Sequence, residues 1–252
     1  MNVSTIGDAR RIARKARSLA AKLEHVQVTI CPPFPFLSVG ASRSIIPAFS
    51  LGAQSCSIDS AGSHTGEVSA GMIRDIGASS VIVGHSEQRK RGDTNETVSR
   101  RAQAAIEAGM TAIVCVGEAK RDEGGSYFDD LTAQIKGSLA GISPKQAKSI
   151  VIAYEPVWAI GAQEAMSPAD IHEASLFIKK TFADLFGAEA ALKAHVLYGG
   201  SVTFRNAADI ITIGKVDGLL VGRESANISG FVELLKAVDA SVGKPGARSD
   251  IH

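Results

Sequence analysis

The segment Ile150-Val151-Ile152-Ala153-Tyr154-Glu155-Pro156-Val157-Trp158-Ala159-Ile160-Gly161 combines an apolar run with a carboxylate and a stiff turn. Residues 150–154 predict a strand buried on both faces, as parallel strands covered by helices are. Glu155 follows at the carboxyl end of this strand, where α/β barrels place catalytic groups. A lone glutamate at such a position is also typical of an ion pair, so its role has to be inferred from the other motifs of the chain.

Six further apolar runs predict strands, and helical patterns alternate with them. The strands are expected at Val26–Cys31, Phe49–Gln54, Ser80–Gly84, Ala112–Val116, His195–Tyr198 and Gly218–Val221. The helices are expected at Pro35–Ser44, Ala70–Ile76, Thr94–Ala108, Tyr127–Leu139, Pro168–Phe186, Thr203–Ile211 and Ile228–Ala240. Alternating β-α units of this length favour a TIM-type (β/α)8 barrel or a doubly wound parallel sheet.

One more helical pattern, Thr5–Glu24, precedes the first strand and has no strand of its own. With it the count is eight helices and seven strands, whereas a closed barrel needs eight strands. We therefore expect an α/β barrel of parallel strands and outer helices that lacks its first strand. Residues 1–242 are expected to form a single domain, followed by a flexible C-terminal tail at 243–252.

Charge and composition exclude several classes of protein. The formal net charge of +1 gives no reason to expect a nucleic-acid partner. No apolar run approaches the ~20 residues of a membrane span, and no apolar signal core is present, so a cytoplasmic protein without membrane contact is expected. The three cysteines, Cys31, Cys56 and Cys115, are widely spaced and odd in number, which favours buried reduced thiols over a zinc site or disulfides.

Several motifs accompany the segment around Glu155. They are Ala53-Gln54-Ser55-Cys56 with Thr65-Gly66-Glu67, Gly84-His85-Ser86-Glu87, Cys115-Val116-Gly117-Glu118, Tyr198-Gly199-Gly200-Ser201-Val202 and Asp217-Gly218-Leu219-Leu220-Val221-Gly222. With Ala153–Gly161, they follow the order and approximate spacing of the triosephosphate isomerase family. From Met1 to about Ala240 the chain resembles that family, and the resemblance implies a TIM barrel.

The resemblance also implies roles for individual residues. Glu155 matches the general base, and His85 matches a neutral electrophile whose pKa is lowered by a helix N-terminus. Glu87 matches a supporting carboxylate, although an ordinary ion pair with Arg89 is the alternative. The lid corresponds to Pro156, Val157, Trp158, Ala159 and Ile160. No cofactor and no metal are expected.

Four positions match backbone donors for the substrate phosphate: Gly161, Ser201, Gly222 and Arg223. Arg223 stands where the family usually has a second glycine, and its side chain could either reach the phosphate or crowd it. The loop with Thr65 matches a segment that inserts into a neighbouring subunit, which implies a homodimer.

The match begins at Met1-Asn2, which corresponds to the end of an Asn-Trp-Lys-Met-Asn segment in the family. Either the sequence starts at an internal methionine or the protein lacks the strand with that lysine, whose loss would cost on the order of 3–4 kcal/mol of transition-state stabilisation. The leading expectation is an isomerase, impaired by this loss, that interconverts dihydroxyacetone phosphate and D-glyceraldehyde 3-phosphate through an enediolate in glycolysis and gluconeogenesis. The alternative is a catalytically silent phosphate-binding or scaffold homologue.

Overall fold

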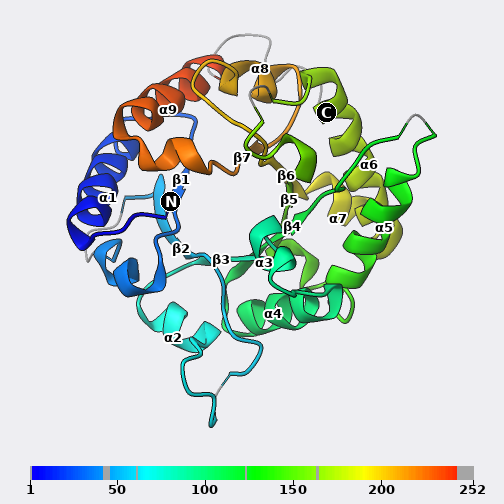
Figure 1. The fold of residues 1–252 in the computed structure, drawn as a ribbon, viewed down its shortest axis with the longest axis horizontal. Coiled ribbons are helices and arrows are strands. Elements are labelled where there is room, and N and C mark those ends of the chain that lie inside the picture. Colours follow the sequence, from blue (N-terminus) through cyan, green and yellow to red (C-terminus); the bar gives the residue numbers. More distant parts are fainter. Residues whose placement is uncertain (1, 42–45, 61, 123, 163–164, 243–252) are drawn as a thin grey trace.

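The computed structural model describes residues 2–41, 46–60, 62–122, 124–162 and 165–242, in which a ring of helices surrounds parallel strands (Figure 1). Within these residues seven strands pair in the order β1-β2-β3-β4-β5-β6-β7. They are β1 Val28–Ile30, β2 Phe49–Ala53, β3 Ser80–Val83, β4 Thr111–Val116, β5 Ile150–Tyr154, β6 His195–Tyr198 and β7 Gly218–Leu219. The consecutive order confirms the predicted barrel, since a doubly wound sheet reverses its strand order.

The outer ring consists mainly of helices that connect successive strands. The α-helices are α1 Ile6–Ala20, α2 Ala70–Asp75, α3 Ser86–Lys90, α4 Asn95–Glu107, α5 Tyr127–Ser138, α6 Pro168–Phe186, α7 Ala188–Leu192, α8 Ala207–Thr212 and α9 Ile228–Val242. The 3-10 helices are η1 Phe34–Val39, η2 Ala147–Ser149, η3 Val157–Ala159 and η4 Arg223–Ala226.

Several element boundaries differ from the prediction. The helix expected at Pro35–Ser44 is the 3-10 helix η1, because the prolines in this segment remove backbone donors; residues 42–44 lie outside the described residues. The helices α3 and α7 were not predicted, and β7 is shorter than the expected strand. The tail at 243–252 also lies outside the described residues.

Local chemistry sets the limits of the long helix α6. The hydroxyl of Ser167 accepts the backbone N–H of Asp170 at 3.2 Å, and Pro168 occupies the first turn. Gly187 ends the helix with a φ of +90°, which glycine adopts without a Cβ penalty. A serine before a proline and a glycine after the last turn are the residue types that favour these two helix ends.

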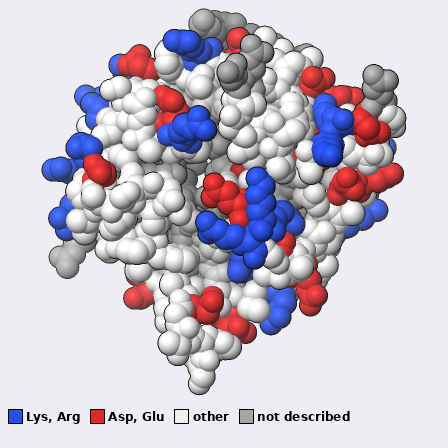
Figure 2. Space-filling model, in the orientation of Figure 1, with Lys and Arg blue, Asp and Glu red and all other residues white. Residues whose placement is uncertain are grey.

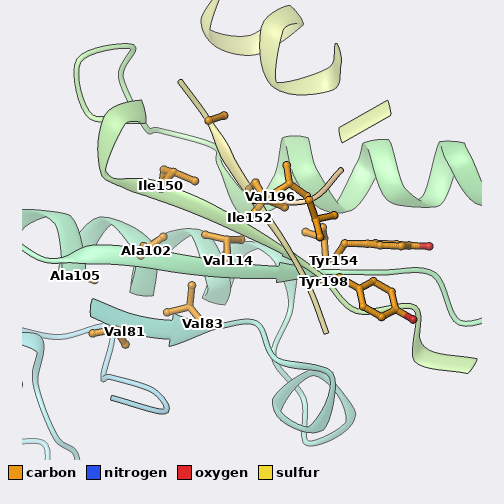
Figure 3. Close-up of a cluster of buried hydrophobic side chains, with 14 of the residues drawn as sticks. Val81, Val83, Ala102, Ala105, Val114, Ile150, Ile152, Tyr154, Val196 and Tyr198 are labelled. Atoms are coloured by element: carbon orange, nitrogen blue, oxygen red, sulfur yellow. The ribbon is translucent and has the colours of Figure 1, made fainter. Parts of the chain in front are cut away.

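Successive side chains of each strand point to opposite faces of the sheet and so form two separate apolar layers. Val81, Val114, Ile152 and Val196 face the helices, and Figure 3 shows them in a cluster that also includes side chains of α4. The intervening residues form a second cluster on the opposite side of the sheet: Ile82, Ile113, Cys115 and Ala153. All three cysteines are free thiols, with Cys56 and Cys115 buried and Cys31 half-buried.

The ring of helices is closed beside the gap, or seam, between the two edge strands of the sheet. Backbone N–H groups of Glu24 and His25 donate to Asp239 Oδ1 at 3.1 and 2.8 Å, which joins the segment after α1 to α9. No pairing links β1 to β7 in the described parts of the chain, and these two strands form the edges of the sheet. A cavity of about 2290 Å³ extends along this seam, with apolar walls that include Val28 and Leu219.

None of the helices in the described residues has both the length and the apolar character that crossing a bilayer requires.

We predict that an additional strand fused ahead of Met1 stabilises the fold. Asn2 lines the cavity, so a strand of about six residues, apolar at alternate positions, could enter the seam and pair with both edges. Each kcal/mol gained should raise the thermal midpoint by about 2–4 °C. Calorimetry against a Gly-Ser extension of equal length measures this effect, and equal midpoints would contradict the pairing.

Candidate active site

The predicted site residues come together at the carboxyl ends of the strands. His85 follows β3, Glu155 follows β5, Ser201 follows β6, and Gly222 and Arg223 follow β7. Because parallel strands all end at the same rim, these segments border one cavity, which Glu87 and Gly161 also line. Figure 2 views the molecule along the barrel and shows basic and acidic side chains gathered beside a central depression.

Glu155 and His85 are in direct contact. His85 Nε2 lies 3.1 Å from Glu155 Oε1, and the Ser86 backbone N–H donates to Glu155 Oε2 at 3.2 Å. His85 Nδ1 accepts the Glu87 backbone N–H at 3.2 Å, so the ring proton shared with Glu155 belongs to Nε2. Glu155 is 3% exposed, and these donors replace the water it loses.

The pKa of His85 differs from the expectation. Burial, the largest single influence, lowers it, but the hydrogen bond and charge of Glu155 and the charge of Glu87 together raise the pKa above its ordinary value of 6.5. The lowered pKa implied by the resemblance is therefore wrong for this conformation, because the carboxylate of Glu155 lies against the ring.

Two glycines make room for Glu155. A Cβ atom on Gly117 would lie 1.9 Å from the backbone oxygen of Glu155, and one on Gly199 would lie 2.9 Å from Glu155 Cγ. Any larger residue would push the carboxylate or its backbone out of place. The two motifs that contain these glycines thus fix the position of Glu155 by leaving space for it.

Glu87 is exposed at the edge of the cavity, and the ion pair with Arg89 that was the alternative for it is not formed in the described structure. Arg89 instead donates to the backbone oxygens of Gly84 and Cys115 and to the side chains of Asn95 and Ser138, at 2.7–3.1 Å. The Arg89 side chain therefore ties the ends of β3 and β4 to the helices behind them.

A buried carboxylate that the sequence analysis did not assign holds the segment after Glu155. Glu118 has no exposed surface and accepts hydrogen bonds from Tyr154 Oη at 2.9 Å and Trp158 Nε1 at 2.9 Å. Arg121 Nε adds an ion pair to Glu118 at 3.0 Å. The available signal was the spacing of Glu118 and Arg121, three residues apart after a strand. Trp158, within η3, is thereby attached to the neighbouring loop.

At the four positions predicted to donate to a phosphate, the backbone N–H groups have no protein acceptor within the described part of the chain. They belong to Gly161, Ser201, Gly222 and Arg223. Ser201 adopts a φ of +41°, and its hydroxyl donates to the backbone oxygens of Ala159 and Ala162 at 2.8 and 3.0 Å. Strained backbone and unsatisfied donors in one place are typical of an anion site.

Thr65 lies away from this cavity. It is exposed in the loop between β2 and α2, which projects from the ring of helices (Figure 1). Among the residues that are described, no group of three His, Cys, Asp or Glu side chains is placed to hold a metal ion.

We predict that Glu155→Gln lowers the pKa of His85, because the largest influence raising it disappears. In the wild type the protonated ring stabilises the fold below the unfolded value of about 6.5, and this stabilisation is lost as the pH rises through the folded pKa. NMR titration of the ring measures the shift. Glu87→Gln is the comparison and should lower the pKa less; an unchanged value in Glu155→Gln would contradict the assignment.

Comparisons with known proteins agree on one family. The family model described as triosephosphate isomerase matches residues 1–238. A triosephosphate isomerase of Chlorobium phaeobacteroides is 43% identical over 83% of this chain and 84% of its own length, and one of Endomicrobium trichonymphae is 38% identical over 92% and 93%. The crystal structure of triosephosphate isomerase from Bartonella henselae superposes with a TM-score of 0.81 at 34% identity, covering 94% of this chain and 96% of that one. The chain belongs to the triosephosphate isomerase family.

Proposed function

We propose that Glu155 and His85 carry the reaction of this triosephosphate isomerase, the interconversion of dihydroxyacetone phosphate and D-glyceraldehyde 3-phosphate. The observation that supports this most is the 3.1 Å contact between a buried carboxylate and an imidazole in one cavity. A base and a hydrogen-bond donor are the two groups that moving a proton between adjacent carbons requires.

The proposed chemistry needs only the side chains already described. The Glu155 carboxylate takes a proton from the carbon beside the carbonyl, and the C–H electrons form an enediolate. The Nε2–H of His85 donates to the oxygen on which charge develops, and the ring passes the hydroxyl proton from the adjacent oxygen to this one. Glu155 then returns the carbon-bound proton to the neighbouring carbon, which leaves the carbonyl on the first carbon. The tautomer assigned to His85, with Nδ1 accepting from Glu87, supports this direction of donation.

In this proposal Glu155 changes partners when substrate binds. Its present donors, His85 and the Ser86 N–H at 3.2 Å, are groups that a substrate oxygen can also use. Glu87 is assigned as a supporting carboxylate whose charge acts on His85. Pro156, Val157, Trp158, Ala159 and Ile160 are assigned as a lid that excludes water from the base.

The acceptor-free N–H groups are proposed to bind the substrate phosphate. Gly161 belongs to the segment after η3, Ser201 to the turn after β6, and Gly222 and Arg223 to the turn after β7. A phosphate dianion offers enough oxygens to satisfy all of these donors, and no metal or cofactor is needed to hold it.

We predict that Glu155→Gln reduces turnover by about 10²- to 10⁴-fold, because an amide cannot accept the proton. A coupled assay in both directions measures this loss, and Glu233→Gln, an exposed change on α9, should leave the rate unaltered. A wild-type chain without isomerase activity that still binds phosphate would instead support the silent homologue.

We also propose a cytoplasmic homodimer in which the loop bearing Thr65 meets a second copy of the chain. The projection of this loop and the exposure of residues 62–67 support a contact there. A cytoplasmic location agrees with free thiols at all three cysteines.

We predict that Thr65→Arg weakens this dimer, because a long charged side chain would have to be buried in the contact. Light scattering should give twice the chain mass of 26.2 kDa for the wild type and a mass closer to one chain for the variant at the same concentration. Glu233→Arg on α9 is the control. A wild type that is monomeric at all concentrations would contradict the dimer.

A further inference from the structure

Arg223 projects a guanidinium group across the mouth of the cavity. It is the first residue of η4, after β7, and it lines the cavity wall. Its Nη2 lies 3.6 Å from the position that a Cβ on Gly161 would take. The side chain therefore spans from the β7 end of the barrel to the segment that follows η3, where Gly161 itself has a φ of +74°.

This cation has no anionic partner within the described residues. No ion pair involving Arg223 is formed there. The adjacent Glu224 turns toward α9, where Asn227 Nδ2 donates to its Oε1 at 3.3 Å and Gly230 lies against it. An unpaired positive charge beside four acceptor-free backbone N–H groups is the arrangement expected of a dianion site.

Other cations on the cavity wall are less suited to that site. Lys179 pairs with Asp217 at 3.1 Å, and both Lys215 and Asp217 precede β7, at the opposite end of the barrel from Glu155. Arg91 follows α3, on the side of His85 and away from the β7 turn. Arg223 is thus the cavity-lining cation next to Gly161 and Gly222.

We infer that the Arg223 side chain binds the substrate phosphate, in addition to the backbone donors around it. This inference rests on the proposed function and deepens it. The planar guanidinium can donate two parallel hydrogen bonds to phosphate oxygens. The phosphate would then join the β7 turn to the segment after η3, so that binding energy from this non-reacting group is available at the lid.

Binding of inorganic phosphate tests the contact without turnover. Calorimetry should show that Arg223→Ala raises the Kd of inorganic phosphate by about 10- to 100-fold, the effect of a lost charged hydrogen bond. The Kd of Arg223→Lys should lie between those of the wild type and Arg223→Ala, since lysine keeps the positive charge but cannot donate two parallel hydrogen bonds. Arg205→Ala is the matched control, because Arg205 is exposed, stacks on Phe204 and does not line the cavity.

Kinetics with and without the phosphate provide a readout that a merely structural role would not produce. Arg223→Ala should lower kcat/KM for glyceraldehyde 3-phosphate by about 10- to 100-fold and leave kcat/KM for unphosphorylated D-glyceraldehyde unchanged. Equal phosphate affinity in wild type and Arg223→Ala, or equal losses on both substrates, would overturn the inference. A wild-type protein that binds phosphate through Arg223 but does not isomerise triose phosphates would contradict the proposed function and leave the inference about Arg223 intact.

Discussion

Parallel pairing in consecutive order, from β1 through β7, is the constraint on which the rest of this structure depends. It makes every strand end at the same rim, so side chains far apart in the chain can meet. It also aligns the alternation of neighbouring strands: Ile82 pairs with Ile113, and Cys115 with Ala153, all within one apolar layer. The opposite faces pack on the helices. A slip of one residue would exchange the two layers and remove Glu155 from the cavity.

Two buried carboxylates near the rim are held in contrasting ways. Glu118 is satisfied by a tyrosine hydroxyl, an indole N–H and an arginine, which form a closed network around the carboxylate. Glu155 is held by the imidazole of His85 and one backbone N–H, at 3.1 and 3.2 Å, with the buried thiol of Cys115 beside it. The first carboxylate is suited to fixing a loop, and the second to exchanging partners. Glu155 lies between Tyr154 and Trp158, which both donate to Glu118. The chain around the proposed base is therefore attached to the Glu118 network on both sides.

The proposed phosphate site and the proposed base are likewise connected through the segment after η3. Ser201 bonds to the backbone oxygens of Ala159 and Ala162, and the guanidinium of Arg223 lies near Gly161. Contacts from the ends of β6 and β7 therefore reach the same stretch that begins at Glu155. An anion bound at this place would act on the proposed lid through contacts that already exist.

The sequence by itself determined the α/β class of the fold and the limits of elements such as α6, because burial patterns, caps and glycine stops depend on residues only a few positions apart. It also placed Glu155 and His85 at strand ends. Only the tertiary structure decided that Glu155 lies against His85 and raises its pKa, that Glu118 binds Trp158, and that Arg223 reaches Gly161. These contacts join residues some 40 to 70 positions apart. Their distances and charges follow from how the strands curl and the helices pack, which no local pattern specifies.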